Sequence, residues 1–320
     1  MKFAAALVCA SSLLSTTTAK SLKSVLASNP KLSILNGLLD QFDLLDTFNS
    51  AKDVTLLAPT NAAYEALAQW GFNVSEVPAP VATALLSYHL LDGEYPTSEI
   101  PSDGPAEIAH TYLKPPILTN VTKGAAVKLS RGGNGEIVTE SGLSVLGGTE
   151  ETDIEYDNGI VHTLNSSMVL PHNISATLAL NQLTEFLQDM TDASDVYPLE
   201  ELKDVTFFFP INSALKKLSP LLSLLSPGQL ASVLEYHAVP GHVLYHDKLE
   251  GDNEYKTLNG GSLRVRSDAR GNIFVNDAQV VRQDLIIYGG VAHIIDDVLI
   301  PKDVPKTTSV GGRFRVQVPY

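Results

Sequence analysis

The sequence contains a single cysteine, Cys9, among its 320 residues. It lies in an N-terminal stretch that indicates a secretory signal, with Lys2 as the positive start, an apolar core from Phe3 to Leu14, and a cleavage site after Ala19. The core is shorter than the ~20 residues that span a bilayer; a buried N-terminal helix is the alternative. After cleavage the chain would have no thiol, which excludes disulfides, cysteine metal sites and thiol catalysis. We therefore expect a secreted protein stabilised by burial alone.

Basic residues are also scarce, with 22 Lys and Arg against 36 Asp and Glu, a net charge of −14. Nucleic acids, heparin and anionic membranes all require a basic face, so the composition argues against these partners. The hydrophobic content of 44% is enough for real cores, and the length suggests two domains. The C-terminal end has no apolar run, so we expect neither an integral membrane span nor a glycolipid (GPI) anchor signal.

Most of the sequence is written twice. Three segments recur in the same order: a buried strand that ends in proline, a helix that ends in Tyr-His, and a closing strand that contains a histidine. The first copies are Val54–Tyr64, Tyr88-His89 and Gly159–Pro171, and the second copies are Val205–Leu215, Tyr236-His237 and Gly290–Pro301. Helical patterns precede strand patterns in each copy, which predicts α+β domains. We place a signal peptide at residues 1–19, domains at 20–171 and 172–302, and a flexible tail at 303–320, where Phe314 and Val316 alternate and could add an edge strand.

Local signals predict several element boundaries. Thr60 or Asn61 is expected to cap the helix that follows the first buried strand. Ser226 begins a capping box with the glutamine three residues later. Glycine-rich and aspartate-rich turns at 132–135 and 268–272 predict one β-hairpin in each copy.

Together these motifs resemble the fasciclin (FAS1) family in the tandem arrangement of fungal secreted and cell-surface members. The first family hallmark resembles 54–67 and 205–218, and the second resembles 158–171 and 289–301. The resemblance covers nearly the whole mature chain. It implies two tandem α+β domains, each a β-sandwich-like wedge of sheets with packed helices, and a role in adhesion or matrix interaction. The chain departs from the family at Asn165, where the second copy keeps the favoured aspartate, and it has no Arg-Gly-Asp sequence.

The resemblance also implies candidate contact residues, because animal members bind integrins through residues around Tyr-His and the closing segment. The matching positions here are Tyr88, His89, Tyr236, His237, Asp296 and Asp297. The integrin itself is not carried over to this chain.

Four histidines occupy repeated positions. They are His89 and His237 after apolar helices, and His162 and His293 within apolar strands. A catalytic residue needs a specific set of companions, which duplication rarely keeps intact twice. We therefore interpret these histidines as buried, hydrogen-bonded structural groups, with a contact role for the Tyr-His pairs as the alternative.

No motif predicts catalysis or a cofactor. His237, His242 and His246 are close in sequence, but Pro240-Gly241 breaks any common helical face between them, so we expect no metal site. The sequence has no Gly-x-Ser-x-Gly elbow and no phosphate-binding loop. We therefore expect a protein that is not an enzyme.

Four Asn-x-Ser/Thr sequons are present, at Asn73, Asn120, Asn165 and Asn173. We expect N-glycans at Asn73 and Asn120, which lie in loop-like stretches. Asn173 lies at the domain boundary, and Asn165 lies on a closing strand, where its side chain could point inward. All four fall in or beside the first domain, which would leave the second open to a partner.

The leading functional hypothesis is a secreted or cell-surface glycoprotein that mediates adhesion by contacting matrix or cell-wall proteins or glycans. One alternative is a structural glycoprotein of the cell wall or vacuolar lumen that has no specific receptor. Another is a hydrolase or small-ligand carrier. A cleft with perturbed acids and bases in one copy would favour an enzyme, whereas an exposed apolar patch common to both copies would favour adhesion.

Overall fold

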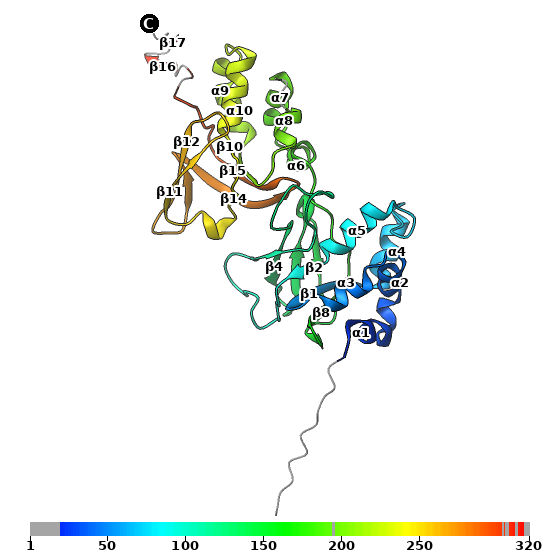
Figure 1. Ribbon diagram of the computed structural model, residues 1–320. Helices are drawn as coiled ribbons and strands as arrows, with labels where there is room; N and C mark the ends of the chain where they lie inside the picture. Colours follow the sequence, from blue (N-terminus) through cyan, green and yellow to red (C-terminus); the bar gives the residue numbers. More distant parts are fainter. Residues whose placement is uncertain (1–19, 194–195, 303, 305–306, 311–312, 317–320) are drawn as a thin grey trace, which may run out of the picture.

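The structure is a computed structural model that describes residues 20–193, 196–302, 304, 307–310 and 313–316. The expected signal peptide, with Cys9, lies outside these residues. The chain forms two α+β domains that are arranged end to end (Figure 1). The predicted fold class is confirmed.

The first domain has two small sheets and an N-terminal group of helices. Its helices are α1 (Leu22–Ser28), η1 (Pro30–Leu32), α2 (Ser33–Gln41), α3 (Leu45–Ser50), α4 (Asn61–Gln69), α5 (Ala79–Tyr88) and η2 (Gly142–Ser144). One sheet has the order β2 (Leu90–Asp92), β1 (Val54–Pro59), β8 (Gly159–Leu164) and β7 (Ile154–Tyr156). The other has the order β3 (Glu107–His110), β4 (Ala126–Arg131), β5 (Ile137–Glu140) and β6 (Leu146–Gly148).

The second domain repeats this plan around one larger sheet. Its helices are α6 (Ile174–Leu180), α7 (Thr184–Asp192), α8 (Val196–Glu200), α9 (Asn212–Leu222), α10 (Pro227–Tyr236) and η3 (His246–Lys248). The sheet has the order β10 (Ala238–Val239), β9 (Val205–Pro210), β15 (Gly290–Ile295), β14 (Ala278–Ile287), β13 (Ile273–Val275), β12 (Ser262–Ser267) and β11 (Asp252–Lys256). Because β14 is long and irregular in register, it joins the two halves that remain separate sheets in the first domain.

The two repeated strands of each domain lie side by side at its centre. β1 pairs in parallel with β8, and β9 pairs in parallel with β15, and every residue of the four strands is buried. The hallmark glycines start these pairings at close range. A Cβ atom on Gly159 would lie 2.0 Å from the carbonyl oxygen of Val54, and one on Gly290 would lie 1.9 Å from that of Val205. Only glycine therefore fits these two positions without moving the backbone.

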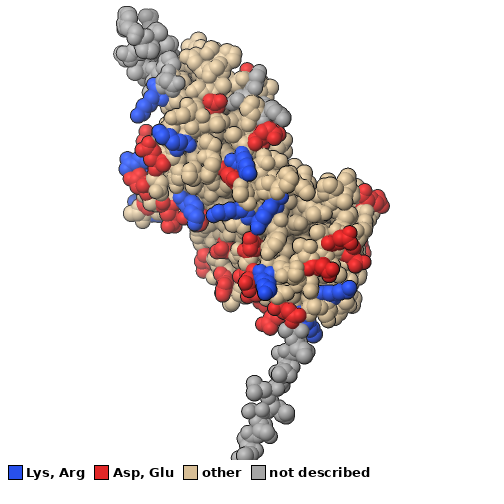
Figure 2. All heavy atoms as spheres, in the orientation of Figure 1, with Lys and Arg blue, Asp and Glu red and all other residues tan. Residues whose placement is uncertain are grey.

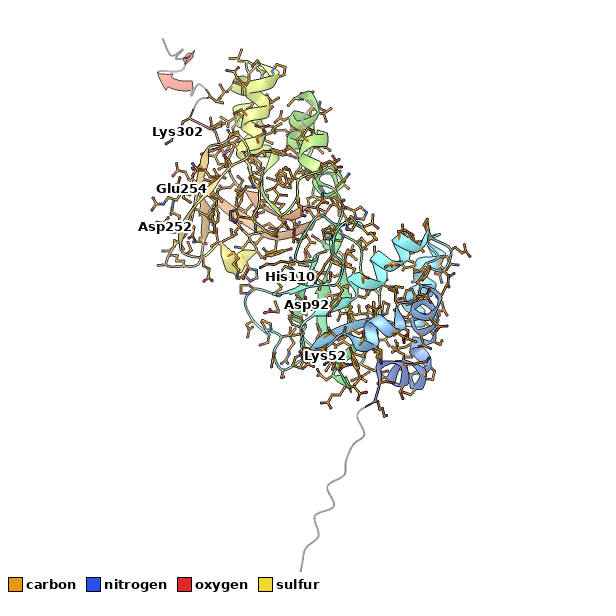
Figure 3. All side chains as sticks on the ribbon, in the orientation of Figure 1. Lys52, Asp92, His110, Asp252, Glu254 and Lys302 are labelled. Carbon is orange, nitrogen blue, oxygen red and sulfur yellow. The ribbon has the colours of Figure 1, made fainter. Side chains whose placement is uncertain are left out.

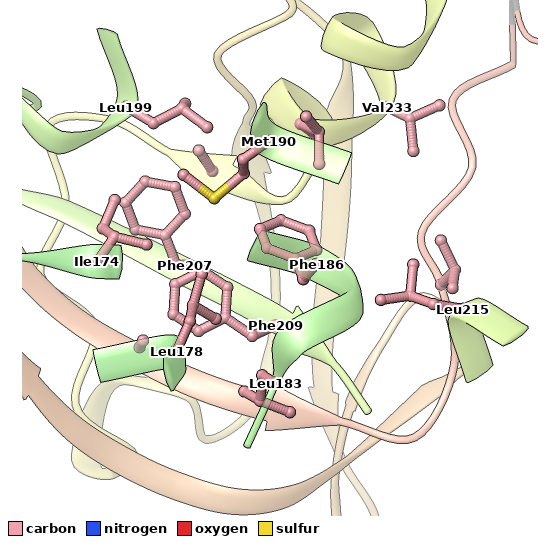
Figure 4. Close-up of a cluster of buried hydrophobic side chains, with 14 of the residues drawn as sticks. Ile174, Leu178, Leu183, Phe186, Met190, Leu199, Phe207, Phe209, Leu215 and Val233 are labelled. Carbon is pink, nitrogen blue, oxygen red and sulfur yellow. The ribbon is translucent and has the colours of Figure 1, made fainter. Parts of the chain in front are cut away.

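Apolar residues of the helices and of the central strands form the core of the second domain. Phe186 of α7 packs against Phe209 of β9, with ring centroids 5.3 Å apart, and Phe207 stacks on Phe209 at the same separation. Figure 4 shows these three rings beside Met190 and Leu183. The helices thus cover one face of the central strand pair, which is how an α+β domain buries a sheet.

The predicted Ser226 capping box and both predicted hairpins are confirmed. The predicted cap at Thr60 or Asn61 is wrong. Thr60 occupies the N-cap position without a side-chain cap bond. The Asn61 amide accepts from the N–H of Ile34 at 2.9 Å and donates to the carbonyl of Pro30 at 3.0 Å, so it ties α4 to the N-terminal helices. A tertiary contact therefore outweighs the helix-capping propensity of asparagine at this position.

Two further features concern the tail and the length of the helices. In the tail, β16 (Thr307–Val310) and β17 (Arg313–Val316) pair with each other as a separate two-stranded sheet. None of the helices in the described ranges is both long and apolar enough to cross a bilayer.

Candidate functional site

The two tyrosines of the Tyr-His pairs anchor helices to sheets. The hydroxyl of Tyr88 donates to the carbonyl of Ala126 at 2.8 Å, and the hydroxyl of Tyr236 donates to the carbonyl of Ser262 at 2.7 Å. Each acceptor is the first residue of a strand, β4 or β12. Burial raises the pKa of Tyr88 well above its usual value. Both hydroxyls are therefore fixed hydrogen-bond donors within their own domains.

The adjacent histidines are neutral. Nδ1 of His89 lies 2.8 Å from the carbonyl oxygen of Leu85, and Nε2 accepts the N–H of Met168 at 3.0 Å. His237 makes the two equivalent bonds at 2.7 and 3.0 Å. A carbonyl can only accept and an N–H can only donate, so the proton sits on Nδ1. Burial lowers the pKa of both rings to about 4.

The strand histidines repeat this arrangement with the ring nitrogens exchanged. Nδ1 of His162 accepts the N–H of Asp153 at 3.1 Å, and Nε2 lies 2.9 Å from the carbonyl oxygen of Tyr95. His293 makes the same bonds, with the N–H of Asp284 at 3.3 Å and a carbonyl at 2.8 Å. Burial lowers the pKa of both rings. The prediction that the four repeated histidines are buried and hydrogen-bonded is confirmed.

The closing-segment aspartates differ from the Tyr-His pairs in exposure. Asp296 and Asp297 are exposed, whereas the four Tyr-His side chains are at most 6% exposed. Asp296 accepts the N–H of Gln279 at 2.7 Å, and Asn165 accepts that of Gly148 at 3.0 Å. Asn165 therefore supplies the same hydrogen-bond acceptor as Asp296 in the second domain and lacks only the negative charge.

The sequons differ in their surroundings. Asn73, Asn165 and Asn173 are exposed, and Asn173 caps α6 by accepting the N–H of Ala176 at 2.9 Å. Asn120 is half-buried, and its side-chain amide donates to the carbonyl of the second-domain residue Glu201 at 3.2 Å.

Asn120 belongs to a segment of the first domain that is hydrogen-bonded to the second. Its N–H donates to the carbonyl of Tyr288 at 2.8 Å, and its carbonyl accepts the N–H of Asp204 at 3.3 Å. The N–H of Thr122 donates to the Asp204 carboxylate at 2.7 Å, and the Thr122 hydroxyl donates to the other carboxylate oxygen. This segment, residues 119–122, is the interdomain clamp.

A second contact joins the domains through β14. The guanidinium of Arg282 donates to the hydroxyl of Ser144 in the first domain at 2.9 Å and to the side chain of Asn181 in its own domain at 2.5 Å. At the domain boundary, the N–H of Tyr288 donates to the carbonyl of His172 at 2.8 Å. The interdomain clamp and Arg282 therefore dock the two domains at two places.

The second domain contains an ion pair that the sequence analysis missed. Nδ1 of His246 lies 2.6 Å from the carboxylate of Asp284, which also accepts the His246 N–H at 2.9 Å. This side-chain hydrogen bond raises the pKa of His246. Burial opposes ionisation of Asp284, but the bond from His246 lowers its pKa below the usual value. The first domain has Thr97 and Asp153 in these places, where the N–H of Thr97 donates to the Asp153 carboxylate at 2.9 Å. The available signal was an aspartate nine residues before the strand histidine in each copy.

A cleft of about 630 Å³ lies between the domains. The first domain lines it with β3 and the end of the interdomain clamp, and the second lines it with the segment 241–248. Figure 3 labels His110 where the first domain faces the second. The His110 ring meets the buried ring of Tyr245 edge-on at 6.2 Å.

The three histidines that suggested a metal site have separate surroundings. His237 is bonded within its own core, His246 is paired with Asp284, and His242 packs edge-on against Tyr255 with ring centroids 5.5 Å apart. Across the described part of the chain, no three His, Cys, Asp or Glu side chains form a group that could hold a metal ion.

Comparison with known proteins places these features in a family. The fasciclin domain model matches residues 30–171 and 181–301. The chain is 51% identical to the fasciclin-like arabinogalactan protein elcF of Phaeosphaeria nodorum, over 89% of each chain. It is 43% identical to the fasciclin-like arabinogalactan protein CTB11 of Cercospora beticola, over 97% of this chain and 86% of that one. A solved FAS1 domain pair from the insect cell adhesion molecule Fasciclin I is 20% identical, with a TM-score of 0.41, and the match covers 86% of this chain and 98% of that one. The chain belongs to the fasciclin domain family, with two such domains in tandem.

Proposed function

We propose that this chain is a secreted or cell-surface glycoprotein that mediates adhesion by binding matrix or cell-wall proteins or glycans. The observation that carries the proposal is the docking of two homologous domains through the interdomain clamp. A docked pair presents two related surfaces at a fixed spacing. Two weak contacts made at once from such a pair give a much higher avidity than either contact alone.

The state of the repeated histidines supports binding rather than catalysis. Histidine is the residue most often used for acid–base chemistry near neutral pH. Here both ring nitrogens of each of the four histidines are occupied by backbone groups. Burial also keeps them neutral, so they are not available to take a proton from a substrate.

The surface offers polar contacts. Figure 2 shows acidic side chains over the outer parts of both domains and several basic ones along the waist between them. Asp296 and Asp297 are exposed acidic residues of the second domain. Two of the three exposed sequons, Asn73 and Asn165, lie in the first domain, and the third, Asn173, lies at the domain boundary. We propose that glycans cluster on and beside the first domain and leave the surface of the second domain open for contact.

The test is co-sedimentation of the full-length secreted protein with insoluble fungal cell-wall material, before and after enzymatic removal of N-glycans. Asp296→Asn with Asp297→Asn removes two surface charges and keeps the acceptor that Asn165 supplies in the first domain. We expect retention of the wild type and a loss of affinity of about fivefold in the double variant. Asp103→Asn, at another exposed aspartate, is the matched control and should leave retention unchanged.

Failure of the wild type to sediment with the wall in either glycosylation state would contradict the adhesion proposal. That result would support the alternative of a structural glycoprotein without a receptor. Retention that is equal in the wild type and the double variant would keep adhesion but remove the two aspartates as contacts.

A further inference from the structure

The cleft between the domains exists only because both domains are present. One wall comes from Ile108 and His110 of β3 and from Lys123, which follows the clamp. The opposite wall comes from the second domain, with Asp204, residues 241–245, Asp247 and Lys248. Its volume of about 630 Å³ lies within the range of ligand-binding clefts, which is roughly 300–1,000 Å³.

The cleft has an apolar side. Val121 and Leu244 are buried and line it, and Ile108 and Val243 are half-buried beside them. Ile108 and Val243 also pack against a small cluster that joins the two domains. A ligand in this cleft would therefore cover apolar surface contributed by both domains, which is favourable in proportion to the area removed from water.

The rim of the cleft is polar but has no net charge. Two cations, Lys123 and Lys248, are matched by two anions, Asp204 and Asp247. Lys248 is already paired with Asp247 at 2.5 Å, and Asp204 already accepts from the clamp. Because the lysine and aspartate charges of the rim cancel, a charged ligand gains little electrostatic attraction. An uncharged ligand with several hydrogen-bond donors and acceptors can bond to both the lysines and the aspartates of the rim. A carboxylate keeps spare acceptor sites when it accepts one or two bonds, and an ammonium has three donors.

We propose that this cleft binds an uncharged oligosaccharide segment, such as a stretch of a neutral cell-wall or matrix glycan. Each sugar hydroxyl both donates and accepts, which suits a rim of mixed carboxylates, ammonium groups and imidazoles. The C–H face of a sugar ring suits the apolar side of the cleft and the imidazole rings of His110 and His242, which line it. The inference rests on the proposed adhesive function and names the ligand class for one site. It gives the tandem arrangement a specific purpose, because neither domain alone has both walls.

The test uses the full-length, N-deglycosylated protein and a panel of uncharged linear tetrasaccharides of glucose, mannose and galactose. Binding is measured by saturation-transfer NMR and calorimetry, with tetragalacturonate as an acidic comparator and a blocked tetra-alanine peptide as a peptide comparator. We expect at least one neutral tetrasaccharide to bind. Lys123→Ala and His242→Ala, at exposed cleft positions, should each weaken it by about fivefold. Lys302→Ala, at an exposed lysine far from the cleft, should leave it unchanged (Figure 3).

Three outcomes would overturn the proposal. These are no binding by any neutral tetrasaccharide, preferential binding of the acidic or peptide comparator, and neutral binding that Lys123→Ala and His242→Ala leave intact. In the same variants, unchanged retention on cell-wall material would show that adhesion holds without the cleft. The cleft proposal and the adhesion proposal can therefore fail independently.

Discussion

Acid should destabilise the second domain through His237. This ring is fully buried in the folded state, and burial lowers its pKa from 6.5 to about 4. The unfolded chain therefore binds a proton at a higher pH than the folded chain does. The contribution of the neutral ring to stability is complete above pH 6.5 and is lost as the pH falls from 6.5 to about 4. At about 1.4 kcal/mol for each pKa unit, the loss is ~3 kcal/mol.

The measurement compares the wild type with His237→Gln, which removes the titrating ring and keeps an amide near the same partners. Urea unfolding with pulsed hydrogen exchange and mass spectrometry reports on peptides of each domain separately. Other titrating groups are the same in both proteins, so their effects cancel in the difference. Between pH 7 and pH 4, the second domain of the wild type should lose about 3 kcal/mol more than that of the variant.

The first domain supplies an internal check, because His89 has the same bonds and the same lowered pKa. His89→Gln should remove the equivalent pH dependence from the first domain and leave that of the second intact. A difference between wild type and variant that does not change between pH 7 and pH 4 would refute the reasoning. So would an NMR titration in which the His237 ring of the folded protein takes up its proton near pH 6.5.

Two further predictions concern the second domain. Gly290→Ala should destabilise it by about 3 kcal/mol or more in thermal or urea unfolding, because the new Cβ would lie 1.9 Å from the carbonyl oxygen of Val205. The control is Gly228→Ala, where a Cβ meets nothing within 4 Å, and it should cost less than about 1 kcal/mol. Equal effects of the two substitutions would contradict the steric argument. The bond to Asp284 raises the pKa of His246, so the stability that this ion pair contributes is complete below the unfolded pKa of about 6.5 and is lost as the pH rises through the folded pKa. His246→Thr, which introduces the residue found at the matching position of the first domain, should therefore destabilise the protein more at pH 5 than at pH 9 in urea unfolding. A destabilisation that does not depend on pH would exclude the charged pair.

The repeat and the local patterns made most of the fold predictable. The Tyr-His pairs located the end of one helix in each copy, the strands that end in proline located the centre of each sheet, and turn residues located both hairpins. The buried state of His89 and its three counterparts also followed from the sequence, since each lies at an apolar position of a repeated element. These are properties of single elements, and the side-chain period along an element records which face is covered.

The candidate site could be predicted only in part. The sequence singled out the Tyr-His pairs as possible contacts, yet the structure turns their side chains inward and leaves Asp296 and Asp297 outside. It indicated that Thr60 or Asn61 caps a helix through its side chain, yet Thr60 makes no cap bond and the Asn61 amide joins two helical segments. In both cases the residue type was informative and the partner was not, because one polar side chain can satisfy several different local or distant groups.

The sequence by itself determined that this protein has two copies of one α+β domain, each with two buried, hydrogen-bonded histidines. Tertiary structure alone decided how the copies meet. Thr122 and Asp204, 82 residues apart, form one end of the interdomain clamp, and His246 and Asp284 form an ion pair across 38 residues. The physical reason is that periodicity fixes the burial of an element along its own length, whereas docking depends on which loops are brought together after both domains have folded.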